Sequence, residues 1–511
     1  MTMLLAPAAA RADTYTVAAN DPVSLQSALH QAETHVNSAG PDVVSIPAGT
    51  YSGNFTYFGD AVHIAGAGPT ATTLTAAGNS TLQINAPGSE VSGLGVVNTA
   101  GTFGFGINLI QGGTVHDVEL HADGTNVAGL LSTGNASLTR ARIAVSATSV
   151  GVRVSNGASM TISDTAMEGA AGTSRGVFAD SAGTTAEVRR LRSVGVTFPM
   201  RAAFGGAALT VSDSLLVLPT GVNSTALEAG DANNPATHTA TLDADRVTIV
   251  GDPAANQRGA SVFANSAGDN FKVRIHDSVI SGVKTPLLCS WLAGTGLTSA
   301  DWSSLPATGD VNAGGGCSAP RTNAVTAEPI FVNAASGDYH QRNDSPLIDA
   351  GDPAPLAATR DLDGLPRPVG RTDLGAYEYQ PPAASEPGGA AADVTPPSVT
   401  LMAKSRLSLR RVLRHGIPVA IGCSEACNYT ATVQLSARSA KRLHVAGRVV
   451  VAKRDVTLFA AGSRKLTVKF MRRARRTLRR HPGVRLEVRA TATDGAGNTG
   501  RARSRGVILS R

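Results

Sequence analysis

The chain has 511 residues, with 55 glycines, 42% hydrophobic residues and only 4% aromatic residues, a composition atypical of a helical bundle and typical of short strands joined by tight turns. The net charge of +7 hides an asymmetry: residues 401–511 hold 26 of the 45 Lys and Arg but four of the 38 acids, so this segment carries +22 and the remainder −15. Opposite charges on the two parts of one chain indicate two domains. No run of residues after residue 12 approaches the roughly 18 apolar residues of a membrane span.

The first segment, residues 1–12, resembles the end of a signal peptide. Ala10-Arg-Ala precedes Asp13 and fits the small-residue cleavage pattern, although the apolar part is short and no basic region precedes it. We expect a secreted or extracellular protein that is soluble after export, and association with the cell envelope is a further expectation.

A short amphipathic helix is expected next, as an N-terminal cap. Asp21-Pro22 fits a helix start, and apolar residues recur at helical spacing at Leu25, Ala28, Leu29, Ala32 and Val36. Short apolar strands are then expected in three segments, Val43 to Tyr51, Val62 to Ile64 and Leu82 to Ile84.

Internal repetition is the strongest signal in the chain. Equivalent segments separated by 23, 22 and 25 residues begin with Gly106-Ile-Asn, Gly129-Leu-Leu, Gly151-Val-Arg and Gly176-Val-Phe, and each is followed by a second alternating strand. A repeat of this length cannot bury its apolar side alone, so it must stack on its neighbours. We predict an all-β fold in which residues 13–317 form a right-handed parallel β-helix.

Stacking places a set of charged residues in one column, because equivalent residues of successive coils lie about 4.8 Å apart. We expect a bend between two strands at this position, where Asp tolerates left-handed backbone, with arginines between the acids. A column of catalytic groups is the alternative. The expected column comprises Asp117, Arg140, Asp164, Arg190, Asp213, Asp245 and Asp277.

Residues 318–380 change in character. They contain Phe331-Val-Asn, Gly337-Asp-Tyr-His, Ser345-Pro-Leu-Ile-Asp-Ala-Gly, Arg360-Asp-Leu-Asp-Gly-Leu-Pro-Arg and Asp373-Leu-Gly-Ala-Tyr-Glu. In order and spacing these motifs resemble the closing segment of secreted β-helix proteins of the choice-of-anchor Q type. The preceding coils are similar in pattern to the broader pectate-lyase-like superfamily. The resemblance implies a surface or secreted protein with a β-helix, without a fixed activity.

A linker and a second domain are expected after this segment. Residues 381–397 are rich in Pro, Gly and Ala, as linkers are. Residues 398–511 alternate like the strands of a sandwich, with a basic run from Met471 to Arg480 that suggests a short helix. Asp494-Gly-Ala-Gly-Asn-Thr resembles a turn of bacterial immunoglobulin-like modules. We predict a small, basic, immunoglobulin-like β-sandwich.

The basic charge of residues 398–511 indicates either an anionic partner, such as a cell-wall polymer or an acidic polysaccharide, or simply a solvated surface. Nucleic acid ranks lower, because aromatic residues are few in this segment: Tyr429, Phe459 and Phe470.

The four cysteines fall into two local pairs, Cys289 with Cys317 and Cys423 with Cys427. Export favours two disulfides. A zinc site of four thiolates is the alternative, although the pairs lie in different predicted domains and neither has the Cys-x-x-Cys spacing.

Catalytic candidates form two groups on predicted strands: Asp117, Glu119 and His121, and Arg274, His276 and Asp277. Lyases of the resembled superfamily use carboxylates that hold Ca²⁺ together with a basic residue, and hydrolases use two carboxylates. Neither group reproduces a family motif.

Three further acids are candidates for Ca²⁺, although Asp-x-Asp-Gly is also an ordinary turn: Asp361, Asp363 and Asp373. We therefore predict a non-catalytic carbohydrate-binding or structural envelope protein, with a polysaccharide lyase or glycoside hydrolase acting on an acidic polysaccharide as the alternative.

Overall fold

The computed structural model describes residues 12–35, 40–170, 172–230, 238–264, 266–291, 293–354, 357, 359–381, 396–443, 450–458, 462–479, 481, 483–494, 498–503 and 506–510. Two compact units divide between residues 382 and 383, and we call them the β-helix unit and the C-terminal unit. Residues 1–11, Val36, most of the expected linker, Phe459 and the centre of the turn after Asp494 lie outside the described residues. No helix in the described ranges is long and apolar enough to cross a membrane.

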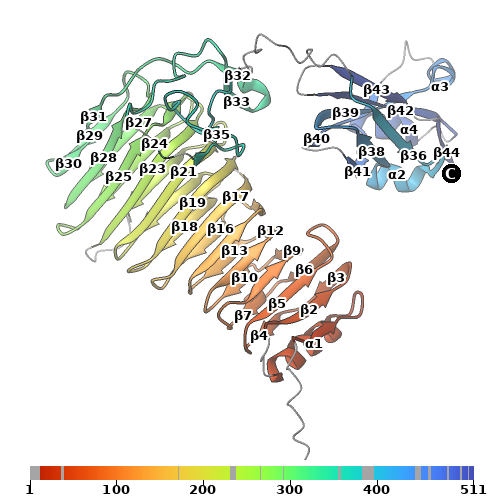
Figure 1. Ribbon diagram of the computed structural model, residues 1–511, viewed down its shortest axis with the longest axis horizontal. Helices are drawn as coiled ribbons and strands as arrows, with labels where there is room; N and C mark the ends of the chain where they lie inside the picture. Colours follow the sequence, from red (N-terminus) through yellow and green to blue (C-terminus); the bar gives the residue numbers. More distant parts are fainter. Residues whose placement is uncertain are drawn as a thin grey trace, which may run out of the picture. The chain divides into compact units, whose positions relative to one another are not determined.

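The β-helix unit begins with the predicted cap, helix α1 (Pro22–Thr34). The Asp21 carboxylate accepts hydrogen bonds from the backbone N–H groups of Val23 and Ser24, at 3.0 and 3.1 Å, and so satisfies donors that a helix start leaves free. The predicted apolar face, including Leu25 and Leu29, is buried. The helix lies beside β2 and β4 and covers the end of the first coils (Figure 1).

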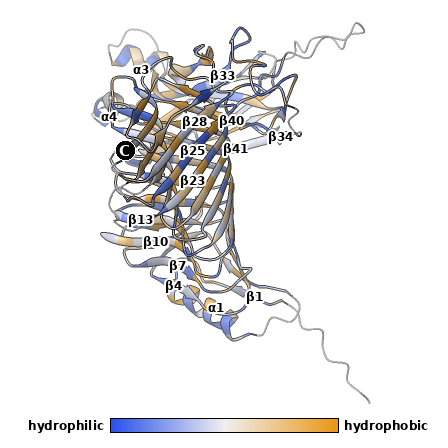
Figure 2. Ribbon diagram, turned by 90° about the vertical axis from the view of Figure 1, so that its left-hand side faces the viewer, coloured by the Kyte–Doolittle hydropathy of each residue, from blue (hydrophilic) through white to orange (hydrophobic). Residues whose placement is uncertain are grey.

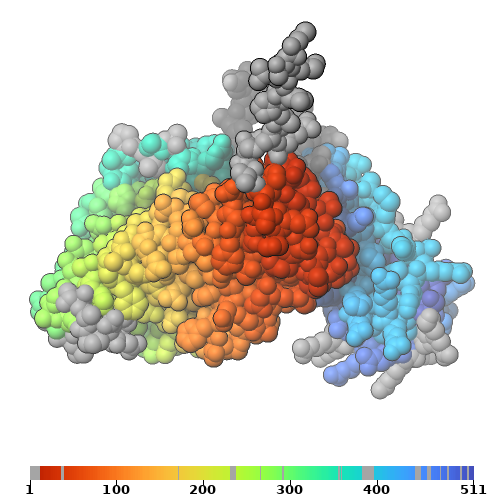
Figure 3. All heavy atoms as spheres, turned by 90° about the horizontal axis from the view of Figure 1, so that it is seen from below, coloured from red at the N-terminus to blue at the C-terminus, as the bar shows by residue number. Residues whose placement is uncertain are grey.

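Strand pairing confirms the predicted parallel β-helix. Each central coil passes through one strand of a first sheet and two strands of a second sheet, as in β10 (Thr102–Leu109), β11 (Gly113–His116) and β12 (Glu119–Ala122). Every pairing in both sheets is parallel and joins residues one coil apart, such as Ile107 with Leu130. Successive coils pack into one continuous body (Figure 3).

The first sheet, which we call sheet 1, has eleven strands within the described residues. In chain order these are β4 (Phe55–Tyr57), β7 (Ser80–Ile84), β10, β13 (Thr125–Ser132), β16 (Val150–Val154), β18 (Arg175–Asp180), β20 (Phe198–Ala203), β22 (Ser224–Gly230), β24 (Gln257–Ala264), β27 (Thr285–Trp291) and β29 (Val311–Ala313).

The second sheet, which we call sheet 2, is wider and contains the bend. Its remaining strands are β1 (Thr14–Thr16), β2 (Asp42–Ile46), β3 (Gly49–Ser52), β5 (Val62–Gly66), β6 (Thr72–Ala76), β8 (Glu90–Ser92), β9 (Gly95–Asn98), β14 (Ala136–Thr139), β15 (Arg142–Val145), β17 (Ser159–Gly169), β19 (Thr185–Val194), β21 (Ala207–Val217), β23 (Thr239–Val250), β25 (Asn270–His276), β26 (Val279–Ser281), β28 (Thr295–Asp301), β30 (Cys317–Ser318) and β31 (Arg321–Thr322).

The predicted glycine register is confirmed in sheet 1. Gly106, Gly129, Gly151 and Gly176 stack in successive coils, and a Cβ at Gly106 would lie 2.4 Å from the carbonyl oxygen of Gly129. A side chain cannot fit between backbones that approach so closely. Hydrophobic and hydrophilic residues alternate along the strands, as Figure 2 shows for β23 and β25, and the inward residues form one core along the coils.

The bend column is confirmed except at one position. Asp117, Arg140, Asp164, Arg190, Asp213 and Asp277 all have left-handed backbone, with φ between 45° and 53°. The prediction of Asp245 is wrong by one residue, because Arg246 has φ 54° and pairs in register with Asp213 and Asp277. The longer connection before β23 hid this shift in the sequence. Asp and Arg therefore alternate strictly along this column from residue 117 to residue 277, and we call the column the bend ladder.

The chain continues the coils through β31 and a parallel bridge at Val325, and then folds back along the outside of the last coils. The strands of this returning part are β32 (Phe331–Asn333), β33 (Asp338–Gln341), β34 (Thr359–Arg360) and β35 (Pro366–Arg367), with a 3-10 turn, η1 (Ala334–Ser336). The backbone N–H of Gly375 donates to the carbonyl of Asp277, and that of Ala376 donates to the Thr248 hydroxyl. We call residues 318–380 the closing segment, and it covers part of the outer face of sheet 2.

The C-terminal unit contains two sheets on a shared apolar core. One sheet comprises β36 (Val399–Ala403), β38 (Ile417–Cys423) and β41 (Gly462–Val468). The other comprises β37 (Arg406–Ser408), β39 (Cys427–Leu435), β40 (Val450–Leu458), β42 (Arg485–Thr493), β43 (Thr499–Arg503) and β44 (Val507–Ser510). The helices are α2 (Leu409–His415), α3 (Ala437–Arg442) and α4 (Arg472–Arg479), and α4 confirms the helix expected in the basic run. An immunoglobulin-like identity stays a prediction.

Both predicted disulfides are formed. Cys289 of β27 bonds to Cys317 of β30 in the β-helix unit, and Cys423 of β38 bonds to Cys427 of β39 in the C-terminal unit. The alternative, a zinc site shared by all four thiolates, is wrong because each sulfur is paired within its own unit.

Candidate functional site

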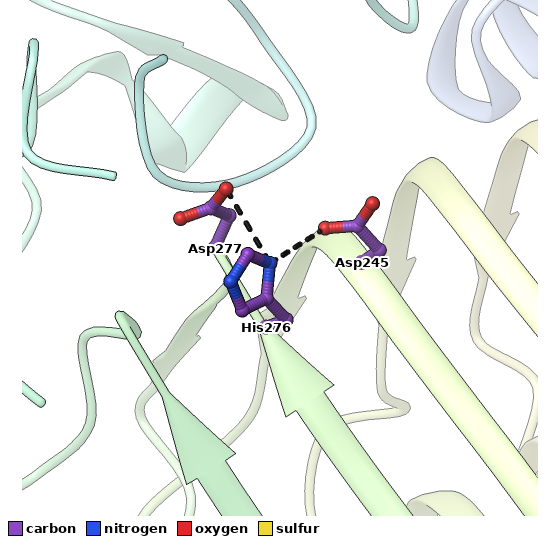
Figure 4. Close-up of side chains that lie close together, drawn as sticks. All are labelled: Asp245, His276 and Asp277. Atoms are coloured by element: carbon purple, nitrogen blue, oxygen red, sulfur yellow. Dashed lines mark hydrogen bonds and ion pairs between the residues drawn. The ribbon is translucent and has the colours of Figure 1, made fainter. Parts of the chain in front are cut away.

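The first candidate site lies where β25 reaches the bend. His276 is the last residue of β25 and pairs in register with Asp245 of β23, and Asp277 is the left-handed residue of the bend. The imidazole Nδ1 lies 3.2 Å from an oxygen of Asp245 and 3.5 Å from an oxygen of Asp277 (Figure 4). The pairing of β25 with β23 brings His276 beside Asp245, and the bend turns Asp277 toward the same imidazole, so the three side chains lie together.

The closing segment completes this cluster. Asp352 places a carboxylate oxygen 3.2 Å from His276 Nε2, and the Asp352 N–H donates to Asp277 at 2.6 Å. The hydrogen bond with Asp245 and the surrounding negative charges raise the pKa of His276 to about 9 despite its burial. Burial raises the pKa of Asp277. At neutral pH the site therefore holds an imidazolium between carboxylates.

The same atoms could hold a metal ion. Asp245, His276 and Asp277 each offer one ligand atom, and these atoms lie within 4.8 Å of one another. A mixed nitrogen and oxygen set suits a divalent cation, which would have to displace the imidazolium proton.

The predicted Ca²⁺ ligands do not form such a group among the described residues. Asp361 accepts hydrogen bonds from three backbone N–H groups, and Asp373 accepts from two. Asp363 instead lies 2.8 Å from His340. These carboxylates organise the turns of the closing segment, and burial raises the pKa of Asp373 to about 7.

Arg274 does not join the His276 cluster. It lies two residues earlier on β25 and makes a two-pronged ion pair with Asp243, at 2.6 and 2.7 Å. The predicted group of three is therefore divided into an ion pair on the strand and a cluster at the bend.

The other predicted group is divided in the same way. Glu119 and His121 lie on β12 with 3.2 Å between their polar atoms. Asp117 is at the bend, where it binds Arg140 through both carboxylate oxygens and lies 2.8 Å from His116. Asp117 thus belongs to the ladder, where the hydrogen bond from Arg140 lowers its pKa.

A second candidate site lies on the outer face of sheet 1 and was not predicted. Strand register stacks Arg153, Phe178, Arg201 and Glu228 in one outward column. The guanidinium carbons of Arg153, Arg175 and Arg201 lie 5.8, 5.7 and 5.5 Å from the centre of the Phe178 ring. Three positive groups therefore surround one aromatic ring.

A groove of about 550 Å³ adjoins this ring. Its lining includes Arg153, Asp180, Phe204 and His238, with the Phe204 and His238 rings packed edge to face at 5.4 Å. Arg153 donates to Asp180 at 2.9 and 2.6 Å. The sequence did contain a signal for this site, since the third residue of each glycine repeat is the outward position. We call the three arginines, Phe178 and this groove the sheet 1 site.

Comparisons with known proteins assign no family. No protein-family model matches the chain, and no curated protein matches it. Among solved structures, ORF18 of Geobacillus virus E2 is 14% identical over 62% of this chain and 60% of its own, with a TM-score of 0.33. The catalytic domain of a GH87 alpha-1,3-glucanase in complex with nigerose is 15% identical over 63% of this chain and 66% of its own, with a TM-score of 0.33.

An alginate lyase from Paenibacillus sp. str. FPU-7 is 14% identical over 60% of this chain and 99% of its own, with a TM-score of 0.32. The chain spans less than two thirds of the length of the first two structures. At such values the assignment of a parallel β-helix rests on the strand pairing itself.

Proposed function

We propose that the chain is a secreted protein that binds an acidic polysaccharide at the sheet 1 site without cleaving it, while the basic C-terminal unit holds it to an anionic polymer of the cell envelope. The observation that carries this proposal is the set of three guanidinium groups around Phe178, beside the groove. Guanidinium groups pair with carboxylates, and the partly buried Phe204 ring in the groove lining offers an apolar face to a sugar, whereas Phe178 itself is buried. Two disulfides are consistent with an extracellular location.

Two arginines of the sheet 1 site are balanced by acids, Arg153 by Asp180 at 2.6 Å and Arg201 by Glu228 at 2.9 Å, so the charge that an anionic sugar would neutralise is that of Arg175. Burial and the nearby charge of Arg201 lower the pKa of Arg175. The buried Nε of Arg175 has no hydrogen-bond partner among the described residues. A sugar carboxylate that paired with the Arg175 guanidinium would relieve its repulsion with Arg201.

The test uses the full chain with polygalacturonate, alginate and neutral dextran. Protein retention is measured by affinity electrophoresis, together with the new chain ends released. We expect retention on the acidic polymers without release of ends, and a loss of at least tenfold in affinity in Arg175→Gln. This change removes one guanidinium and leaves no carboxylate newly unpaired.

The matched control is Arg142→Gln, which removes an exposed arginine from β15 on sheet 2. Equal losses in both variants would assign retention to overall charge and refute the sheet 1 site. Retention of none of the polymers would refute polysaccharide binding altogether.

Catalysis at the His276 cluster is a second candidate function, favoured by the partly exposed carboxylates of Asp245 and Asp352 on either side of His276. A lyase or hydrolase at this site would release ends that Asp245→Asn abolishes while retention persists. Adding or chelating Ca²⁺ in the same assay tests whether the reaction needs a metal. If ends were released by the unchanged chain, the non-catalytic proposal would be wrong.

A further inference from the structure

The C-terminal unit contains a groove between two of its helices, α2 and α4. The groove encloses about 1210 Å³. Its basic lining consists of five arginines and one histidine: Arg410, Arg411, Arg414, His415, Arg475 and Arg479. We call it the arginine groove. The other described lining residues are a serine and two leucines, so its lining contains no acid and no aromatic ring among the described residues.

Helix periodicity places these arginines on the outside. In α2, Leu409 and Val412 are buried in the core of the unit, which leaves Arg410, Arg411 and Arg414 exposed. In α4, the buried residue is Leu478, and Arg475 and Arg479 lie one turn apart on the groove side. The apolar residues thus fix both helices, and the arginines face the opening between them.

The arrangement costs stability. Arg410 and Arg414 are four residues apart on one helix, as are Arg475 and Arg479, and like charges at this spacing repel by a few tenths of a kcal/mol per pair. The acids of the unit do not offset this repulsion. Asp455 lies 3.1 Å from Lys453, and Glu487 lies 3.4 Å from Arg489.

The other two acids among the described residues of the unit, Asp494 and Glu425, are also bound elsewhere. Asp494 accepts a hydrogen bond from the backbone N–H of Asn498, and Glu425 lies beside Ser424. Within the described residues, none of the five groove arginines forms an ion pair. Their charge is therefore available to an external anion.

We infer that the arginine groove binds a linear polymer of phosphodiester groups, and this inference rests on the proposed role of the C-terminal unit. A guanidinium fork matches two phosphate oxygens, and several forks in one groove match a ligand with repeated charges. Single-stranded nucleic acid would use aromatic stacking, which the described lining does not offer. A glycopolymer of the cell envelope with phosphodiester links fits this chemistry.

The experiment measures binding of the full chain to poly(glycerol phosphate) as a function of salt concentration. The groove variant combines Arg410→Gln, Arg414→Gln and Arg479→Gln, all of which change exposed side chains. The control makes the same change in charge on α3 of the same unit, with Arg438→Gln, Lys441→Gln and Arg442→Gln.

We expect the groove variant to bind at least 30-fold more weakly at low salt. Its slope of log affinity against log salt should fall by about 2, because each phosphate neutralised contributes about 0.7 to 0.9. The control should lose less than threefold. Melting curves of both variants check that the unit remains folded.

The outcomes separate this inference from the proposed function. Equal losses in both variants would refute the groove and leave a diffuse basic surface as the anchor. Tighter binding of polygalacturonate or single-stranded DNA at the groove would refute the phosphodiester polymer as ligand. Failure of the unchanged chain to bind any of these polymers would refute the proposed role of the C-terminal unit itself.

Discussion

The arginines of the two units differ in how their charge is balanced. In the β-helix unit, each arginine of the bend ladder binds a carboxylate one coil earlier, as Arg140 binds Asp117 and Arg246 binds Asp213. In the C-terminal unit, the arginines of the groove lie together while the acids pair elsewhere. The same residue type thus stabilises a repeat in one unit and forms a surface for a ligand in the other. Both the scarcity and the position of the acids make the difference, because residues 401–511 hold four acids for 26 Lys and Arg.

The largest effect is expected where a balanced arginine is fully buried. Arg367 of the closing segment lies between Glu378, at 2.8 Å, and Asp213, at 3.0 Å, and it is inaccessible to solvent. Arg367→Met leaves the buried Glu378 carboxylate without its cation, while Asp213 keeps Arg246, and we expect a cost of about 3–5 kcal/mol. Thermal unfolding and protease cleavage within residues 318–380 measure the loss.

The control for this change is Arg342→Met, which breaks an exposed pair with Asp344 in the same segment. It should leave both the melting temperature and the cleavage rate unchanged. A melting temperature that fell equally in both variants would mean that the buried network does not hold the closing segment.

The two disulfides give a second comparison between the units. Cys289 and Cys317 are 28 residues apart, and Cys423 and Cys427 are four apart. Loop-closure entropy predicts losses of about 3–4 kcal/mol for the first pair and about 2 kcal/mol for the second when both cysteines become Ala. Both tryptophans, Trp291 and Trp302, lie in the β-helix unit, so their fluorescence follows unfolding of that unit alone. Removal of the first pair should shift this transition, and removal of the second should not.

Backbone conformation and charge can be separated at the bend ladder. Asp164 has φ 51° and binds Arg190 through both oxygens, at 2.7 and 2.9 Å. Asp164→Ala loses the pair and adds left-handed strain, for an expected cost of about 1–2 kcal/mol. Asp164→Gly loses the same pair but tolerates the backbone, so it should cost less than the Ala variant in urea unfolding. The reverse order would mean that the left-handed strain of Ala is smaller than the entropy that Gly loses on folding.

Much of the β-helix could be predicted because each local signal was repeated. Four glycines at 22 to 25 residues fixed the register of sheet 1, and alternation identified the inward residues. The error at Asp245 arose where a coil is longer than its neighbours, so that spacing no longer determined the register. Arg153 and Phe178 stand in the aligned repeats, but outward positions of a strand are usually solvent-exposed, so the pattern alone does not single them out.

The sequence motifs identify the closing segment, but they do not predict which residues of the coils it packs against. Its motifs identified a distinct segment, yet the contact of Asp352 with His276 joins residues 76 positions apart. No repeat relates these two residues, so periodicity carries no information about their pairing. The arginine groove was hidden for the same reason: charge density was evident in residues 401–511, but the approach of α2 to α4 depends on the packing of the whole unit.

The smallest predicted effect concerns pH and two histidines that each lie between carboxylates, His276 of β25 and His340 of the closing segment. His276 lies between Asp245 and Asp352, and His340 lies between Asp338 and Asp363, at 2.7 and 2.8 Å. Burial lowers the pKa of His340, but its two hydrogen bonds more than offset this and raise it to about 9. The pKa of His276 is likewise about 9, against 6.5 as the ordinary value.

A histidine whose pKa is raised on folding stabilises the folded state fully below its unfolded pKa, and the contribution disappears as the pH rises through the folded pKa. Stability from both histidines should therefore be complete below a pH of about 6.5 and be lost by a pH of about 9 to 10. Because both rings are more than a third exposed, we expect only about 1 kcal/mol from each after solvent screening.

The comparison that isolates this contribution is the unchanged chain against the double variant His276→Gln and His340→Gln. Burial raises the pKa of Asp373 to about 7, so ionisation of this carboxyl also lowers the stability of the fold as the pH rises. Asp373 is present in both proteins, so its contribution cancels in the comparison. Between pH values of about 6 and 10, the unchanged chain should therefore lose about 2 kcal/mol more stability than the double variant. Parallel pH profiles would mean that the two histidines are not held as cations, and that Asp352 and Asp363 reach them without contributing to the stability of the closing segment.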